Sequence, residues 1–435
     1  MTLPNDFVEK YRALLGQEAD EFLASFEEPA VSAFRVNPLK EVQKRFSNPI
    51  PQTPWGYYGK ISGKSAEHVT GLVYSQEPAA QMVVQVAGIK PGMRVLDLAA
   101  APGGKSTHIL SYLGNTGLLV SNEISTKRSK VLVENIERFG ARNVVVTNDS
   151  ADRLARIFSN YFDLIVFDGP CSGEGMFRKD PAACQYWHND YPVTCANLQQ
   201  AILQDAIDML APGGRLVYST CTWSPEENEA VVSWLLETYD FLKLVDVPKI
   251  NGMSAGIEQE QTARMYPHRF RGEGQFVAVL EDIRSSERQR IKPEKTNLTK
   301  QEHQLWQDFA RQHLFVELDG ILQTFGEQLY LLPRDLPALK GVKIARNGLY
   351  LGTFKKNRFE PSFALGLALK PSEVKQTVNI SDEAFEDYAR GLTVTLSEPL
   401  PNGWYQLVVQ GNGLGFAKVV GQTIKNHFPK GLRLH

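Results

Sequence analysis

The stretch VLDLAAAPGGKSTHIL, residues 95–110, is the segment that decides how this chain folds. A short apolar run ends near Asp97, an Ala-Pro-Gly-Gly turn follows, and the residues after the turn are typical of a helix. Two adjacent glycines let main-chain amides approach a ligand closely, and the N-terminus of the following helix favours an anionic group. The segment therefore predicts a strand, a ligand-binding turn and a helix.

Strand-like runs alternate with helical patterns on both sides of this segment. The predicted strands are 94–100, 118–123, 143–149, 162–168, 215–221, 241–247 and 275–282. Ser125 and Gly140 are start and stop signals of one helix, and Ser224-Pro225-Glu226-Glu227 predicts a capping box for another. Residues 252–274 are polar and irregular, so we expect an active-site loop or lid there. The pattern predicts a Rossmann-like α/β domain with a seven-stranded, mostly parallel sheet.

Composition narrows the class of protein. The 435 residues are enough for two to four domains, and 47 Lys and Arg against 49 Asp and Glu give a net charge of −2, which identifies no partner. No apolar run reaches the roughly 18–20 residues of a membrane span, and Asp6 and Glu9 argue against a signal peptide. Four cysteines without metal-site spacing exclude a disulfide scaffold and predict no metal. We expect a cytoplasmic protein with no membrane partner.

Five segments are predicted along the chain: an N-terminal subdomain (1–75), the α/β domain (76–283), a linker (284–300), a first C-terminal module (301–375) and a β module (376–435). The 37 residues after Glu398 contain no acid. They carry four cations and four aromatic residues, namely Lys418, Lys425, Lys430, Arg433, Trp404, Tyr405, Phe416 and Phe428. The preceding module has a basic cluster that includes Lys343 and Arg346. Such surfaces suit RNA, but a solvated face of an ordinary β domain fits the composition equally well.

Three kinds of nucleotide site use a glycine-rich turn between a strand and a helix, and we compared each with this sequence. A P-loop requires a glycine where Ala99 stands, and the spacing GxGxxG of a dinucleotide site is absent. The site that remains is an S-adenosylmethionine-binding site. In such a site, acids at the ends of the next two strands accept hydrogen bonds from the ribose and the adenine. We therefore expect the cofactor to contact a turn and three acids: Ala99, Ala100, Ala101, Pro102, Gly103, Gly104, Lys105, Glu123, Asp149 and Asp168.

Two of the cysteines lie in a chemically suggestive setting. Cys171 and Cys221 each follow a predicted strand, at the edge where open α/β sheets bind ligands. Their neighbours include Asp168, Ser219 and Thr220, which make a poor apolar core and a good thiolate site. We expect Cys184 and Cys195 to be ordinary buried residues.

These motifs together resemble a known family. AAAPGGK (99–105), DGPCSGEG (168–175) and STCTWSPEENE (219–229), with RVNP (35–38) and RMYPH (264–268), are similar to the Nop/Sun family of RNA cytosine-C5 methyltransferases over roughly residues 30–282. Residues 413–433 resemble the PUA-like RNA-binding domain of its RsmF-type members, and residues 346–362 resemble the module before it. The resemblance implies a class I S-adenosylmethionine methyltransferase fold, with an RNA-recognition subdomain at residues 1–75 and a PUA-like RNA-binding domain at residues 376–435.

The resemblance also implies roles for four residues. Cys221 would attack C6 of cytosine, Cys171 would assist product release, Asp168 would hold the base edge, and Lys105 would neutralise charge in the same pocket. The implied substrate is a cytosine of the decoding region, in 16S rRNA or the 30S subunit, and we expect a monomer. Two alternatives remain: a P-loop-like ATPase that uses Lys105 and Ser106, and a non-catalytic RNA-binding ribosome assembly factor.

Overall fold

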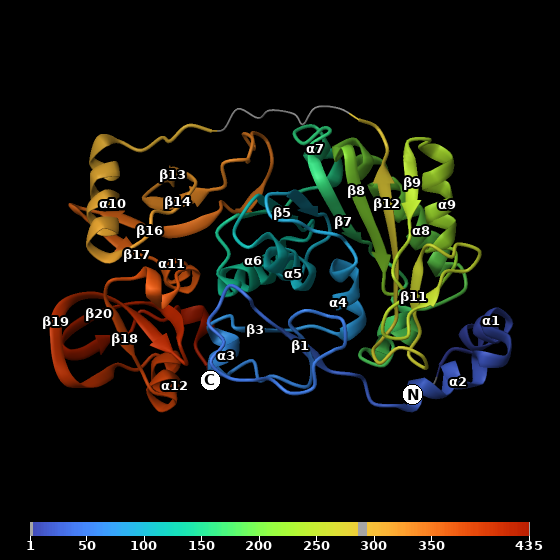
Figure 1. Ribbon diagram of the computed structural model, residues 1–435, viewed down its shortest axis with the longest axis horizontal. Coiled ribbons are helices and arrows are strands. Elements are labelled where there is room, and N and C mark those ends of the chain that lie inside the picture. The colour runs from blue at the N-terminus through green and yellow to red at the C-terminus, as the bar shows by residue number, and fades with distance from the viewer. Residues whose placement is uncertain (1–2, 286–293, 435) are drawn as a thin grey trace.

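The computed structural model describes residues 3–285 and 294–434 (Figure 1). Part of the predicted linker, residues 286–293, lies outside the described residues. The chain begins with helices α1 (Asn5–Leu15) and α2 (Ala19–Ala24). An antiparallel sheet with strand order β2-β1-β3 follows, and it is accompanied by a short helix: β1 Ala33–Val36, β2 Gly56–Tyr58, α3 Ala66–Val69, β3 Val73–Ser75.

A mixed sheet of ten strands forms the centre of the molecule (Figure 1). Its order is β10-β11-β12-β8-β7-β4-β5-β6-β15, and β9 also pairs with β12. Its strands are β4 Arg94–Asp97, β5 Leu118–Asn122, β6 Val144–Thr147, β7 Phe162–Asp168, β8 Leu210–Thr220, β9 Leu242–Val245, β10 Ser254–Ala255, β11 Ala263–Met265, β12 Gln275–Asp282 and β15 Ile344–Arg346. Strands β4 to β8 are parallel, so their carboxyl ends share one edge.

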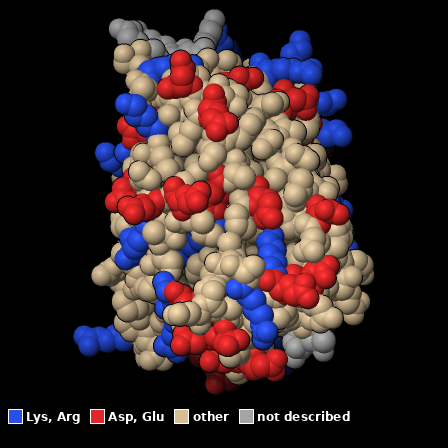
Figure 2. Space-filling model, turned by 90° about the vertical axis from the view of Figure 1, so that its right-hand side faces the viewer, with Lys and Arg blue, Asp and Glu red and all other residues tan. Residues whose placement is uncertain are grey.

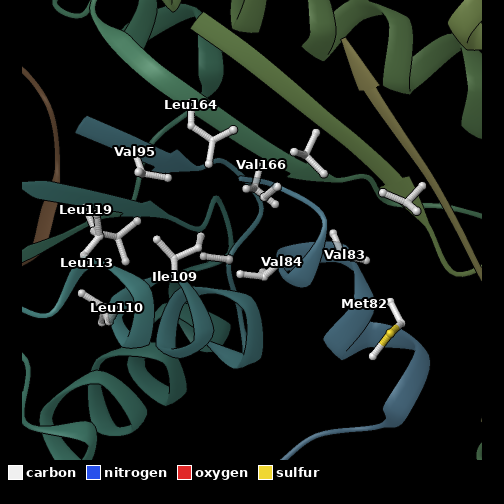
Figure 3. Close-up of a cluster of buried hydrophobic side chains, with 14 of the residues drawn as sticks. Met82, Val83, Val84, Val95, Ile109, Leu110, Leu113, Leu119, Leu164 and Val166 are labelled. Carbon is white, nitrogen blue, oxygen red and sulfur yellow. The ribbon is translucent and has the colours of Figure 1, made fainter. Parts of the chain in front are cut away.

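Helices cover both faces of this sheet because successive strand residues point to opposite sides. Val95 packs into the cluster formed with α4, α5 and α6, whereas Leu96 packs into the cluster formed with α7, α8 and α9. Figure 3 shows the first cluster, in which side chains of α4 and α5 meet β4, β5 and β7. The covering helices are α4 Pro78–Gln85, α5 Gly104–Leu113, α6 Thr126–Phe139, α7 Ala151–Ala155, α8 Tyr191–Met209 and α9 Glu229–Thr238. Full burial of a Leu or Ile side chain contributes about 1.5–3 kcal/mol, so these clusters fix the helices against the sheet.

All seven predicted strands are present, and the sheet is larger than predicted. Two of the three additional strands, β10 and β11, come from residues 252–274, which we expected to form an irregular loop or lid. Arg264 of β11 is fully buried and forms an ion pair with Glu229. The other residues of this segment are irregular, as expected, and the Arg264 ion pair fixes the segment to the sheet edge.

The helix signals give one success and one failure. Ser125 accepts a hydrogen bond from the amide of Arg128, and Gly140 ends α6 with a φ of 80°. The predicted capping box at residues 224–227 is wrong, because these residues form turns and α9 begins at Glu229. Glu227 instead accepts a hydrogen bond from the amide of Ser172, 55 residues away.

The C-terminal part contains two further sheets. The first is antiparallel, with order β13-β14-β16-β17, and the second has order β18-β19-β20. Their elements are α10 Lys300–His313, β13 Ile321–Phe325, β14 Gln328–Leu332, β16 Leu349–Lys355, β17 Arg358–Pro361, α11 Phe363–Ala368, β18 Thr377–Asn379, α12 Asp382–Arg390, β19 Val394–Val409 and β20 Asn412–Lys425. Tyr405, Phe416 and Phe428 are buried, so these predicted stacking rings are core residues, while Lys418, Lys425 and Lys430 are exposed.

The terminal parts of the chain are in contact with each other. The C-terminus lies beside α3 (Figure 1), and Ala66 of α3 packs into the apolar cluster of the last module. Asn412 and Glu41 exchange two hydrogen bonds of 2.9 Å through the main chain of Glu41. The first and last modules therefore pack against each other and form a continuous surface. Among residues 3–285 and 294–434, no helix has both the length and the apolar character required to cross a membrane.

Candidate active site

Buried polar side chains hold the turn after β4 in place. Gly103 precedes α5 with a φ of 113°, a conformation that favours glycine, and an added Cβ would lie 3.1 Å from Leu132. Ser106 donates to Asp97 at 2.6 Å, and Arg35 of the RVNP motif donates to the carbonyl of Gly104 at 2.9 Å. Burial raises the pKa of Asp97 to about 7. The turn is therefore held in one conformation by residues from β1, β4 and α5.

A cavity of about 320 Å³ opens at the carboxyl edge of the sheet beside this turn. Five of the ten residues predicted to contact the cofactor line it: Ala99, Ala101, Glu123, Asp149 and Asp168. The remaining five support or flank it: Ala100 donates its amide to Asn122, Pro102 accepts from Asn135, Gly103 caps α5, Gly104 accepts from Arg35, and Lys105 pairs with Asp168. Asn122, Arg128, Ile124 and Ile202 also line the cavity, and the sequence analysis did not identify them.

The two predicted acids after β5 and β6 are both buried at the cavity wall. Glu123 accepts a hydrogen bond from the amide of Ser125 at 2.8 Å through one oxygen, and its other oxygen lies 3.5 Å from Arg128. Asp149 accepts from the amide of Ser150 at 3.0 Å. A ribose presents two hydroxyl donors and an adenine one amino donor, so carboxylates at these two places fit an adenosyl group.

The two predicted cysteines come together at the same cavity. Cys171 lies three residues after β7, and Cys221 directly follows β8, which pairs with β7 in parallel. Their sulfur atoms are 3.1 Å apart. The hydrogen bond to Cys221, burial and the charge of Cys221 raise the pKa of Cys171 well above its ordinary value. Cys171 therefore holds its proton firmly. Cys184 and Cys195 are buried, as predicted.

Asp168 and Lys105 form an ion pair beside the sulfur atoms. Lys105 Nζ is 2.5 Å from Asp168 Oδ2, while Ser219 and Gln275 donate to Oδ1 at 2.6 and 2.9 Å. Burial lowers the pKa of Lys105, but the Asp168 carboxylate outweighs it and the net pKa is raised. The lysine therefore stays charged and the carboxylate stays oriented toward the cavity.

A buried glutamate that the sequence analysis missed supports the Cys171 turn. Glu227 Oε2 accepts from the amide of Ser172 and from Gln199, both at 2.9 Å. Gln199 also donates to the carbonyl of Pro170 at 2.9 Å. Glu227 and Gln199 thus hold the main chain on both sides of Cys171. The sequence predicted a local capping role for Glu227, whereas its hydrogen-bond partner Ser172 is distant in sequence.

Burial raises the pKa of Glu227 from 4.5 to about 7, which predicts a pH dependence of stability. The folded chain holds this proton more tightly than the unfolded chain, so stability falls as pH rises from about 4.5 to 7. Relative to wild type, Glu227→Gln should gain on the order of 2–3 kcal/mol over this interval. Melting temperatures measured between pH 5 and 8 test this, with Glu237→Gln on the exposed side of α9 as the control. Parallel curves for Glu227→Gln and wild type would contradict it.

Comparison with known proteins gives a family for the whole chain. A model described as 16S rRNA methyltransferase RsmB/F matches residues 84–281, and models for the N-terminal, first C-terminal and PUA domains of RsmF match residues 3–78, 308–369 and 375–434. The Ribosomal RNA small subunit methyltransferase F of Erwinia tasmaniensis is 34% identical, over 99% of this chain and 96% of that one. The chain belongs to the RsmB/F family of 16S rRNA methyltransferases, RsmF type.

Other relatives agree with this placement. The methyltransferase F of Shewanella loihica is 31% identical, covering 95% of this chain and 91% of that one. A methyltransferase homologue from Pyrococcus horikoshii is 29% identical with a TM-score of 0.55, covering 63% of this chain and 94% of that one. The structure of NSun6 from Pyrococcus horikoshii with SFG has a TM-score of 0.59 at 23% identity and covers 65% of this chain and 99% of that one, a likeness of fold. As an RsmF-type methyltransferase, the chain has the S-adenosylmethionine methyltransferase fold that the sequence predicts, with the central sheet extended by three strands.

Proposed function

We propose that the protein methylates C5 of a cytosine in 16S rRNA through a covalent bond between Cys221 and C6 of the base. The observation that carries this proposal is the pair of sulfur atoms 3.1 Å apart, at the carboxyl ends of neighbouring parallel strands and on the wall of the cavity beside the Gly-Gly turn. Membership in the 16S rRNA methyltransferase family supplies the reaction class and the substrate class.

The cavity has the donor and acceptor pattern for S-adenosylmethionine. Glu123 would take the ribose hydroxyls and Asp149 the adenine amino group, while the turn from Ala99 to Gly104 would receive the methionine end. When bound, S-adenosylmethionine supplies an electrophilic methyl group. Asp168 and the two cysteines line the same cavity, and Lys105 pairs with Asp168, so the base and the methyl donor would meet in this cavity.

Cytosine C5 is a weak nucleophile, which is why a thiolate is needed. The Cys221 thiolate adds to C6, and the electrons of the C5–C6 double bond move to C5, which then accepts the methyl group. Asp168 would hold the N3 and N4 edge of the ring, and Lys105 would keep that carboxylate oriented. Removal of the C5 proton and departure of Cys221 then restore the aromatic ring.

The electrostatics of the pair fit a second role for Cys171. The contacts that raise its pKa most are the hydrogen bond to Cys221, burial and the charge of Cys221. Once Cys221 is a neutral thioether, the contributions of its charge and its hydrogen bond are gone and the pKa of Cys171 falls. A base must take the proton from C5 before Cys221 can leave, and we assign this role to the Cys171 thiolate, whose sulfur lies 3.1 Å from that of Cys221. The two sulfur atoms thus lie so that Cys171 can act after Cys221 has bound C6.

We place the RNA-docking surface on the N-terminal sheet and the C-terminal modules. The acid-free segment after Glu398 displays the exposed cations Lys418, Lys425 and Lys430, which suit the phosphate backbone. Figure 2 shows the side of the molecule at the right of Figure 1, where acidic and basic side chains are interspersed and no single sign of charge dominates. A P-loop-like ATPase is disfavoured because Lys105 is paired with Asp168. A non-catalytic assembly factor would have no use for the sulfur pair.

Mapping of 5-methylcytosine in rRNA tests the proposed function. We expect 16S rRNA from cells that lack the gene to lose 5-methylcytosine at one or more positions. Wild-type protein should restore the modification and Cys221→Ala should not, because the covalent bond to C6 cannot form. A 5-methylcytosine map that is identical with and without the gene would reject the proposal.

A further inference from the structure

The first C-terminal module contributes a strand to the sheet of the methyltransferase domain. Strand β15 pairs antiparallel with β6, placing Ile344 opposite Thr147 and Arg346 opposite Val146. Lys343, directly before β15, accepts a hydrogen bond at its carbonyl from the amide of Asn148 at 2.8 Å. The amide of Lys343 donates to Asp149 Oδ2 at 3.0 Å. The predicted α/β domain at residues 76–283 is therefore contacted by a later segment of the chain beside the cofactor site.

The contact acts on an acid at the cavity wall. The main chain of Asp149 is held within the methyltransferase domain, because Asn122 donates to its carbonyl at 2.9 Å and accepts from its amide at 3.2 Å. Its Oδ1 accepts from Ser150. Its Oδ2 accepts from Lys343, which lies 194 positions along the chain. The carboxylate is therefore held at Oδ1 by Ser150 and by Arg153, 3.7 Å away, in its own domain, and at Oδ2 by a residue of another module.

Strand β15 is firmly attached where it meets the sheet. Arg346 was predicted to belong to a basic RNA-binding cluster, but it is buried, donates to the carbonyl of Val144 at 3.1 Å and lies 3.8 Å from Glu137. Apolar side chains of the same module, Ile321, Leu332 and Leu336, join the core cluster beneath α7 and α8. The amide of Lys343 is thus held at a defined place, while its side chain is exposed to solvent.

We propose that the first C-terminal module completes the cofactor site, with the main-chain amide of Lys343 as the positioning group that orients the Asp149 carboxylate toward the adenosyl group. This inference rests on the proposed function, which assigns Asp149 to the cofactor. It makes cofactor affinity depend on the docking of a module that also belongs to the RNA-binding part of the chain. Because coupling between two sites is reciprocal, bound cofactor also stabilises the β15 contact. The simpler role of β15, covering the open edge of β6, would affect stability and not affinity.

Two variants of Lys343 separate these roles. Lys343→Pro removes the amide hydrogen, and Lys343→Ala removes the exposed side chain while it keeps the amide. By calorimetry with S-adenosylmethionine, we expect Lys343→Pro to bind roughly three- to tenfold more weakly, the effect of one lost hydrogen bond. Lys343→Ala should bind as wild type does. Circular dichroism and melting curves of both variants show whether the fold is retained.

A measurement on the unaltered chain covers the case in which Lys343→Pro does not fold. We expect S-adenosylmethionine to slow hydrogen exchange at the amide of Lys343, although this residue lies in another module. Unchanged exchange, or wild-type affinity in a folded Lys343→Pro, would overturn the inference.

Asp149→Ala distinguishes this inference from the proposed function. Strong loss of affinity in Asp149→Ala with none in Lys343→Pro would reject the positioning role alone and leave the cofactor assignment in place. Wild-type affinity in Asp149→Ala would reject the positioning role and the assignment of Asp149 to the adenosyl group, while the methylation proposal, which rests on the sulfur pair, would stand.

Discussion

Cys171→Ala is expected to accumulate a covalent protein–RNA adduct, whereas Cys221→Ala is expected to form none and to be inactive. Without Cys221 no thiolate reaches C6, and without Cys171 the C5 proton is removed slowly, so that the bond to Cys221 persists. Incubation with a 16S rRNA fragment and S-adenosylmethionine, followed by a denaturing gel, detects the adduct as a band of reduced mobility. Turnover of Cys171→Ala should fall by roughly 10²–10⁴-fold, the usual contribution of a general base.

The sulfur pair makes this experiment discriminating, because either cysteine is close enough to react. An adduct with Cys221→Ala and none with Cys171→Ala would assign the attack to Cys171. Full turnover by Cys221→Ala would reject the covalent mechanism. Cys195→Ala is the matched control, since Cys195 is buried in α8 and lies outside the cavity lining. That variant should turn over normally and leave no adduct.

Glu123→Ala is expected to weaken S-adenosylmethionine binding by roughly 10- to 150-fold. The reason is that a buried carboxylate which accepts two hydroxyl donors contributes about 1.5–3 kcal/mol. Calorimetric titration of the full-length protein measures the change. Binding that stays at the wild-type value would remove Glu123 from the cofactor site.

Two controls keep this result interpretable. Glu123 also accepts from the amide of Ser125, so a disturbed start of α6 would lower the affinity of Glu123→Ala in the same way. Glu123→Gln keeps an acceptor for that amide while removing the negative charge, and we expect it to lose affinity to a smaller extent. Glu134→Ala removes an exposed acid from the same helix and should leave affinity unchanged.

Much of the central fold was predictable because its signals are local. A buried strand needs a short apolar run, and each of the seven predicted runs forms one, with 162–168 and 275–282 matching to the residue. Ser125 and Gly140 mark the two ends of α6, and each forms hydrogen bonds with residues three or four positions away. The predicted capping box is absent for the opposite reason, because Glu227 accepts a hydrogen bond from Ser172, which is distant in sequence. Local propensity predicts an element only when no tertiary contact competes for its side chains.

Residue types and their period are enough to predict a Gly-Gly turn, acids at strand ends and two cysteines after strands. The contacts among these groups follow from the tertiary structure alone. It brought Cys171 and Cys221 within 3.1 Å across 50 positions, paired Lys105 with Asp168, and placed the amide of Lys343 on Asp149. Such contacts depend on strand order and on how modules pack, and neither is encoded in a local pattern. The first two contacts arise because parallel strands bring their carboxyl ends to one edge, and the third arises because β15 pairs with β6.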